Sequence, residues 1–152
     1  MGIVNDAIQP FYADNLFFSG KILKKVSSAV TVTYEPKGSW NASWMADTGN
    51  TKHKTFRMDQ HLTLGIMPTK QLNISATVRH SFSHESKGND VQYFFMDAKA
   101  TYIQKRMDLS LSVNNVFNVT NYTRYSLTPY QLITDRYQIR GRMGILRLSY
   151  YF

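Results

Sequence analysis

Apolar and polar side chains alternate at every second position along most of this chain, and this period constrains the fold more than any other feature. Between Met107 and Phe117, for example, Leu109, Leu111 and Val113 alternate with aspartate, serine and asparagine. Side chains at i and i+2 share one face of a β-strand, so such a segment has one apolar and one polar face. Comparable segments cover residues 15–24, 28–46, 55–67, 70–83, 91–105, 107–117 and 137–152. The pattern predicts an all-β fold of about seven long, amphipathic, antiparallel strands.

The predicted connections between these strands alternate in length. Short turns lie near residues 25–28, 68–70 and 105–106, whereas longer polar stretches span residues 47–54, 84–90 and 118–136. This sorting is typical of transmembrane β-barrels, which have short turns on one side and longer loops on the other. The strands are also long, since residues 92–105 would extend over about 46 Å. We interpret residues 15–152 as an antiparallel transmembrane β-barrel wall and residues 1–14 as a lead-in or loop.

The composition excludes several other classes of protein. The 152 residues suffice for one ordinary domain, and the absence of cysteine excludes disulfides and thiolate metal sites. There is no run of about 18 apolar residues that would predict a transmembrane helix. The net charge is +8, but the basic residues are scattered over predicted turns and polar faces and form no recognisable nucleic-acid-binding motif. We therefore expect no nucleic-acid partner.

The final residues, RMGILRLSYYF, combine the alternation with an aromatic end. Leu146, Leu148, Tyr150 and Phe152 lie at alternate positions and share one face of the predicted last strand. A last strand of this kind resembles the assembly signal of bacterial outer-membrane proteins. The resemblance implies that these residues form an outer-membrane assembly signal read by the barrel assembly machinery.

Further runs of the sequence resemble one family. LSLSVNNVFNVTNY, from Leu109 to Tyr122, resembles the NNLFN…Y signature near the end of TonB-dependent outer-membrane receptors, with Val116 in place of the usual leucine. YFFMDAKATY, from Tyr93 to Tyr102, and YQIRGRMGILRLSYYF, from Tyr137 to Phe152, look like the last strands of such receptors from Bacteroidetes-type bacteria. The latter run has Arg-Gly-Arg where the family often has Arg-Pro-Arg, and FFSGKILKKV resembles an earlier strand and turn. The resemblance covers most of residues 16–152 and is strongest from residue 93 onward.

This resemblance implies an integral protein of the bacterial outer membrane and a barrel of about 22 strands with an N-terminal plug. A receptor of this family imports a nutrient such as an iron chelate, a glycan, a peptide or a vitamin, and TonB drives the import through the proton gradient of the inner membrane. The implied partners are outer-membrane lipid and lipopolysaccharide, the remainder of the barrel and its plug, TonB acting through that plug, and a surface lipoprotein. On this interpretation the chain forms barrel wall and outer loops.

The strand count also indicates that these strands are part of a larger barrel, either as the C-terminal third of its wall or as one subunit of a split barrel, with the remainder on the same precursor or on a partner chain. A self-contained barrel normally has an even number of strands, and an open sheet edge in lipid leaves backbone groups unpaired. One alternative is a small stand-alone structural or adhesive outer-membrane barrel without transport, with an eighth strand in Ile3–Tyr12, although Asp6 and Pro10 disfavour a strand there. A third interpretation is a soluble ligand-binding β-barrel, whose apolar face would turn inward.

The polar face of each predicted strand supplies the candidate functional residues. In a membrane barrel it faces the lumen, and Asp97 is expected to join a salt-bridge network with Lys99 and Arg79. Candidate substrate-contact residues in the longest connection are Tyr122, Tyr125 and Tyr130, whose rings could stack on a sugar or siderophore. The predicted lumen-facing residues are Arg57, Asp59, Asn73, Thr77, Arg79, Asp97, Lys99, Thr101, Ser110, Ser112, Asn114 and Arg147.

The sequence gives no indication of catalysis or of a bound metal. His80 and His84 share the apolar parity of their strand, whereas His61 lies on the polar parity of its own strand, so these histidines do not converge. No G-x-S-x-G motif accompanies the serine, histidine and aspartate residues. We therefore expect no enzyme activity, no catalytic residues, no metal site and no cofactor.

Overall fold

A computed structural model of the chain describes residues 2–4, 7–45, 52–86, 90–127 and 132–152, and within these ranges the regular secondary structure is entirely β-strand. None of these ranges forms a helix of the length and apolarity needed to cross a membrane. The strands are β1 (Gly2–Val4), β2 (Ala7–Gln9), β3 (Phe11–Ser19), β4 (Ile22–Lys25), β5 (Val30–Met45), β6 (His53–Ile66), β7 (Leu72–Glu85), β8 (Val91–Gln104), β9 (Met107–Asn114), β10 (Asn121–Leu127), β11 (Leu132–Gln138) and β12 (Met143–Tyr150).

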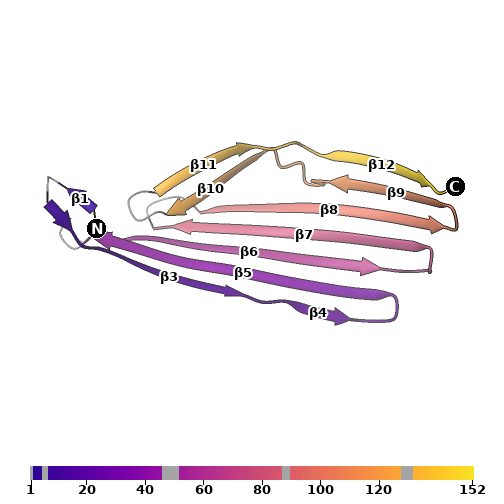
Figure 1. Cartoon of the computed structure of the whole chain (residues 1–152), viewed down its shortest axis with the longest axis horizontal. Helices are drawn as coiled ribbons and strands as arrows, with labels where there is room; N and C mark the ends of the chain where they lie inside the picture. Colours follow the sequence, from indigo (N-terminus) through magenta and orange to yellow (C-terminus); the bar gives the residue numbers. More distant parts are fainter. Residues whose placement is uncertain (1, 5–6, 46–51, 87–89, 128–131) are drawn as a thin grey trace.

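One antiparallel sheet contains eight of these strands, in the order β12-β9-β8-β7-β6-β5-β3, with β4 also pairing with β5 (Figure 1). The strands β3 and β4 share one edge of β5 in a continuous register, because Ser19 pairs with Lys37 and Ile22 pairs with Tyr34. The backbone N–H of Gly20 donates to the carbonyl of Pro36 between them, at 3.0 Å. The sheet confirms the predicted all-β, antiparallel fold, and its first predicted strand is interrupted at this glycine.

The pairing register gives the sheet two chemically distinct faces. The row through Leu146 illustrates the apolar face, because every neighbour across the sheet is also apolar. Even-numbered residues form this face on β5 to β8. On β9 the odd-numbered residues form it, because Ala98 pairs with Val113. On β12 the even-numbered residues form it again, because Leu111 pairs with Leu146. From β12 to β5 this row contains Leu146, Leu111, Ala100, Ile74, Ile66 and Val30.

The prediction of a single last strand over residues 137–152 is wrong. Tyr137 and Gln138 belong to β11, which pairs with β10, and the last strand of the sheet is limited to Met143–Tyr150. The predicted loop over residues 118–136 therefore contains most of a two-stranded hairpin. The β9 strand also ends at Asn114 instead of Phe117, because Asn115 adopts a positive φ of 53° that a strand does not permit.

The N-terminal residues do not add a strand to the described sheet. Residues of β1 and β2 pair with each other, for example Ile3 with Ile8, and β3 begins at Phe11, before the predicted start at residue 15. In the part of the chain that the structure describes, β12 pairs only with β9, and β3 and β4 pair only with β5. The described sheet is therefore open, with β12 at one edge and β3 and β4 at the other.

The sheet forms a single layer and buries very little of its own surface. Among the side chains that the structure describes, Ala42 is the one buried hydrophobic residue, and the buried polar residues are Ser43, Thr55 and Glu85. Cross-strand pairs on each face contribute about 0.2–1 kcal/mol each, and they are the main packing interaction available in such a layer. The apolar face therefore has no covering layer within the described chain.

Candidate functional site

The apolar face is broad and exposed. Leu146, Leu148 and Leu111 retain 70%, 64% and 52% of their accessible surface, and exposed apolar side chains occur on every strand of the sheet except β5. Soluble monomers rarely expose a continuous apolar surface of this extent. A surface of this kind requires an apolar environment, a second layer or a partner.

The apolar face forms a band that crosses the sheet obliquely. At the β12 edge the band reaches the short-turn end, where Tyr150 pairs with Met107. At the β3 edge its side chains lie toward the opposite end, because Leu16 pairs with Trp40 and Tyr12 stacks on Trp44 with ring centroids 5.7 Å apart. The row of paired residues that contains Leu146 ends at Val30, which is the first residue of β5. The band is thus inclined to the strand direction.

A short polar row interrupts this band. The hydroxyl of Tyr34 donates to Oε1 of Gln60 at 2.7 Å, and Nε2 of Gln60 lies 3.3 Å from Nδ1 of His80. The His80 ring stacks on Phe94 with centroids 4.3 Å apart. Because these polar groups bond to one another across three neighbouring strands, the desolvation penalty of placing them on an apolar face is reduced.

The residues predicted to face the lumen share the opposite, polar face. The register pairs Thr77 with Asp97, Lys99 with Ser112, and Thr101 with both Asn73 and Ser110. Arg147 lies next to Ser110 on β12. Arg57, Asp59, Arg79 and Asn114 have the same parity on their strands. The structure therefore brings the whole predicted set to one surface.

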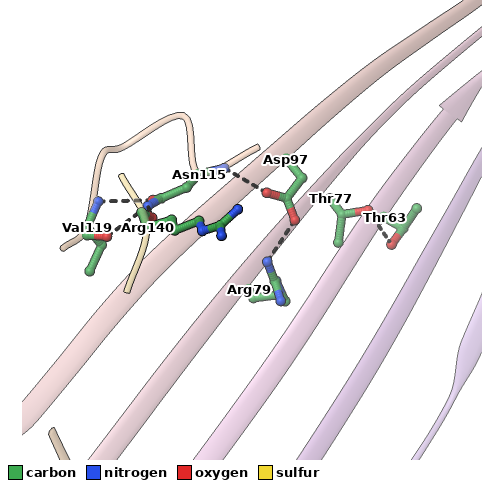
Figure 2. Close-up of polar contacts among 7 residues, drawn as sticks. All are labelled: Thr63, Thr77, Arg79, Asp97, Asn115, Val119 and Arg140. Atoms are coloured by element: carbon green, nitrogen blue, oxygen red, sulfur yellow. Dashed lines mark hydrogen bonds and ion pairs between the residues drawn. The ribbon is translucent and has the colours of Figure 1, made fainter. Parts of the chain in front are cut away.

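Side chains of neighbouring strands are connected on this polar face (Figure 2). Arg79 forms an ion pair with Asp97 at 2.7 Å, as predicted, and Thr63 and Thr77 share a hydrogen bond of 3.2 Å. Arg57 pairs with Asp59 on its own strand at 2.7 Å. The hydroxyl of Ser81 donates to the same aspartate at 2.7 Å. Arg57, Asp59, Arg79 and Asp97 are therefore paired without a second layer, whereas no ion pair of the described residues includes Lys99, which was also predicted to join this network.

Asn115 and Asn118 of the NNVFN run form a turn that joins three parts of the chain. Both have positive φ, 53° and 57°, in the left-handed region that asparagine tolerates better than most residues. The side chain of Asn115 accepts from the backbone N–H of Val119 at 2.9 Å and donates to the carbonyl oxygens of Val119 and Arg140 at 2.7 and 2.9 Å (Figure 2). Its backbone N–H donates to Asp97 at 2.8 Å.

Asn118 holds the other side of this turn. Its side-chain oxygen accepts from the backbone N–H of Arg142 at 2.9 Å, just before β12 begins. A Cβ added at Gly141 would come within 2.7 Å of the same oxygen, so a larger residue there would displace the Asn118 side chain. The guanidinium of Arg142 also donates to the carbonyl of Val116 at 2.9 Å. Together these bonds fix where β9 ends, where the β10–β11 hairpin leaves the sheet and where β12 returns.

The β10–β11 hairpin lies near the end of the sheet with the long connections (Figure 1), and its residues Tyr122 and Arg124 line a recess together with Arg57 and Ser83 of the polar face. Tyr122 packs on Tyr93 and Phe95 of β8, with centroids 4.9 and 6.2 Å apart, and on Tyr137 of β11 at 6.1 Å. The backbone N–H of Thr123 donates to the Tyr93 hydroxyl at 2.9 Å. Tyr122, predicted as a substrate-contact residue, is thus engaged in attaching the hairpin.

Of the other two predicted contact tyrosines, Tyr125 belongs to the described residues. Tyr125 lines a small recess between the hairpin and the polar face, together with Arg57 and Ser83. Tyr130 lies outside the described residues.

A larger cavity of about 480 Å³ lies between the polar face and β10. Its charged lining residues are Lys37, Arg57, Asp59 and Arg124, and Phe17 contributes an aromatic wall.

Arg124 and the aromatic anchor formed by Tyr93 and Phe95 were not identified from the sequence. One signal was available: Tyr93-Phe94-Phe95 places aromatic rings on both faces of one strand and so departs from the alternation.

The residues of the predicted assembly signal lie on the edge strand β12 and just after it. Leu146, Leu148 and Tyr150 belong to the apolar face, and the ring of Phe152 meets that of Tyr150 edge to face with centroids 5.2 Å apart. Within the described residues, no group of three or more His, Asp or Glu side chains is arranged to hold a metal ion.

Comparison of the chain with models of known protein families, with curated proteins and with solved structures found no match.

Proposed function

We propose that this chain forms part of the wall of an outer-membrane β-barrel in a TonB-dependent receptor of about 22 strands, which imports a nutrient across the bacterial outer membrane. The apolar face contacts lipid, and the polar face lines the lumen that holds the plug. The β10–β11 hairpin forms part of the outer vestibule. The remainder of the barrel and the plug, TonB, the assembly machinery and a surface lipoprotein are the partners that go with this function.

The observation that carries the proposal is the broad, exposed apolar band. Its oblique course supports membrane insertion, because barrel strands tilt by about 35–45° to the membrane normal, and a band parallel to the membrane then crosses the strands at an angle. Tyr12 and Trp44 at one boundary of the band and Tyr150 at the other are placed as aromatic girdles would be. A soluble barrel would instead turn this band inward, away from water.

The open edges support a larger barrel. In lipid each unpaired backbone group costs several kcal/mol, so β12 and the edge formed by β3 and β4 need neighbouring strands. The receptor family is supported by the NNVFN run, because its asparagines hold the junction between β9, the hairpin and β12. The nutrient is an iron chelate, a glycan, a peptide or a vitamin. The cavity with Arg57 and Arg124 is the place where such a molecule would meet this part of the wall.

The test uses the absence of cysteine from the chain, which permits single-cysteine variants carrying a fluorescent label. Adjacent positions serve as matched pairs: Leu64→Cys with Thr63→Cys, and Leu111→Cys with Ser112→Cys. In lipid vesicles we expect spin-labelled lipid to quench the labels at Leu64 and Leu111, and aqueous iodide to quench those at Thr63 and Ser112. Equal quenching within each pair would overturn the membrane-wall proposal. Iodide quenching of the polar-face labels together with no lipid quenching at any position would favour the soluble barrel.

A second measurement separates a wall segment from a stand-alone barrel. The chain is refolded in detergent and run on a gel with and without boiling. A closed barrel resists SDS until heated, so a single monomeric mobility shift would favour the stand-alone structural or adhesive barrel. We expect no shift, or ladders of edge-paired oligomers, because the described sheet has two open edges.

A further inference from the structure

Charged side chains are distributed unequally between the two ends of the sheet. The short-turn end, where β4, β6, β8 and β12 finish, lies at the right of Figure 1. Its exposed cations, which we call the basic rim, are Lys24, Lys25, Lys70, Lys105 and Arg106. The opposite end has charges of both signs, at Asp14, Lys52, Lys54, Glu85, Asp90, Arg124, Asp135 and Arg136. The short-turn end is therefore the cationic end of the sheet.

The cations of the basic rim have no carboxylate partner among the described residues. The ion pairs among the described residues are Lys21 with Glu35, Arg57 with Asp59, Arg79 with Asp97 and His84 with Asp90. None of them includes a residue of the basic rim. Asp108 lies beside the rim, but its carboxylate accepts a hydrogen bond of 2.8 Å from the Tyr151 hydroxyl. The basic rim therefore remains available to an external anion.

The basic rim follows the boundary of the apolar band across the sheet. Lys105 and Arg106 form the turn directly beyond Met107, which pairs with Gln104 and Tyr150 at this boundary. Lys70 precedes Leu72, which pairs with Tyr102. On β4, Lys24 follows Ile22 on the parity of the apolar face and pairs with Val32, and the exposed Val26 lies beyond it. The cations of the turns beside β7, β8 and β9 thus lie directly beyond the boundary of the band, whereas Lys24 lies among its last apolar residues on β4.

We propose that the basic rim binds the headgroups of anionic phospholipids in the leaflet that meets the short turns. This inference rests on the proposed membrane location of the sheet. In a leaflet the lipid phosphates lie directly above the hydrocarbon, which is the position of the rim relative to the apolar band. Lysine and arginine can keep their stems along apolar surface while the charge reaches the headgroups. Each such cation near an anionic membrane strengthens binding by about fivefold.

The test compares insertion of the full chain into two kinds of vesicle: phosphatidylcholine alone, and phosphatidylcholine with about a third phosphatidylglycerol. Flotation with the vesicles and protection from protease report insertion. We expect tighter insertion into the anionic vesicles. This preference should weaken as salt is raised, because salt screens exposed charges. The triple variant Lys70→Gln, Lys105→Gln and Arg106→Gln should reduce the preference by at least about tenfold.

A control variant removes the same number of cations of the same kinds from the other end: Lys52→Gln, Lys54→Gln and Arg136→Gln. It should keep the preference for anionic vesicles. Equal insertion of the unmodified chain into both vesicles at low salt would overturn the basic-rim proposal and leave the membrane proposal standing. An equal loss of preference in both triple variants would also overturn it, because net charge would then suffice. Failure to insert into either vesicle would count against both proposals.

Discussion

On the polar face of the sheet, neighbouring strands exchange hydrogen bonds and ion pairs, as between Thr63 and Thr77 or Arg79 and Asp97. On the apolar face, leucines such as Leu111 and Leu146 pair across strands but stay largely exposed. One face therefore carries polar and charged side chains that bond to one another or can be hydrated, whereas the other exposes apolar side chains that the described chain does not cover. The two faces therefore differ in what they require from their surroundings.

The largest effect is expected from a charge placed on the apolar face. In lipid, Leu111→Arg should destabilise the folded chain by about 2–4 kcal/mol, whereas Ser112→Arg on the adjacent polar position should cost less than about 1 kcal/mol. Urea unfolding of both variants in vesicles measures the difference. Similar losses for the two variants would mean that the two faces do not meet different solvents.

The next effect concerns the asparagine turn at the edge of the polar face. Asn115→Ala removes the side-chain bonds to Val119 and Arg140 and places alanine at a positive φ, so we expect a loss of about 2–4 kcal/mol in unfolding free energy. Asn115→Gly should lose about 1 kcal/mol less, because glycine accepts this backbone conformation. Asn114→Ala is the neighbouring control and should stay within about 0.5 kcal/mol of the unmodified chain.

The hairpin over the polar face should detach when its aromatic anchor is removed. Tyr122→Ala loses the ring contacts with Tyr93 and Phe95, and each aromatic pair contributes about 0.5–1.5 kcal/mol. Tryptic cleavage after Arg124 and Arg136 should therefore accelerate by about tenfold. The same substitution on the apolar face, Tyr102→Ala, should leave this cleavage rate unchanged. Faster cleavage in both variants would mean general destabilisation.

The smallest effect is a pH dependence at the short-turn end. The hydrogen bond to Asp108, with the negative charge of that carboxylate, raises the pKa of the Tyr151 phenol above its ordinary value. The neutral phenol is the favoured form, so this stabilisation is complete below the ordinary tyrosine pKa of about 10 and is lost as the pH rises through the raised pKa. An ultraviolet titration compared with Tyr151→Phe isolates this phenol. Asp108→Asn should return its pKa toward the ordinary value.

The faces of the strands were predictable from the sequence because alternation is a local property. The apolar residues of the segments containing Leu64, Ile74 and Leu109 lie on one side of the sheet, as their parity predicts, and Leu146, Leu148 and Tyr150 of the last strand join them. Ile145 departs from this pattern, because it pairs with Ser112 on the polar face. The ion pair of Arg79 with Asp97 could also be predicted, because both residues have polar parity on adjacent segments. Whether the polar face lines a lumen and the band meets lipid stays a prediction, because a sheet alone does not identify its solvent.

The β10–β11 hairpin was not predictable in the same way. The run Asn121–Leu127 has no clean alternation of apolar and polar residues that would predict a strand. The hairpin depends instead on contacts of Tyr122 with residues of β8 that are far away in sequence. The cavity lined by Lys37, Arg57 and Arg124 depends on that hairpin and was missed with it. Asn115 was recognised only as part of a motif. Its role as a junction becomes visible only when the carbonyl of Arg140 is placed beside it.

The turn at Lys105 and Arg106 limits how this protein can change during evolution. Gln104 pairs with Met107 across the turn, so the apolar face passes from even-numbered residues on β8 to odd-numbered residues on β9. A single inserted or deleted residue would rotate β9 and β12 by half a turn and exchange their two faces. Relatives should therefore vary the amino acids of this turn freely while keeping its length, and tolerate insertions mainly in the long connections at the other end.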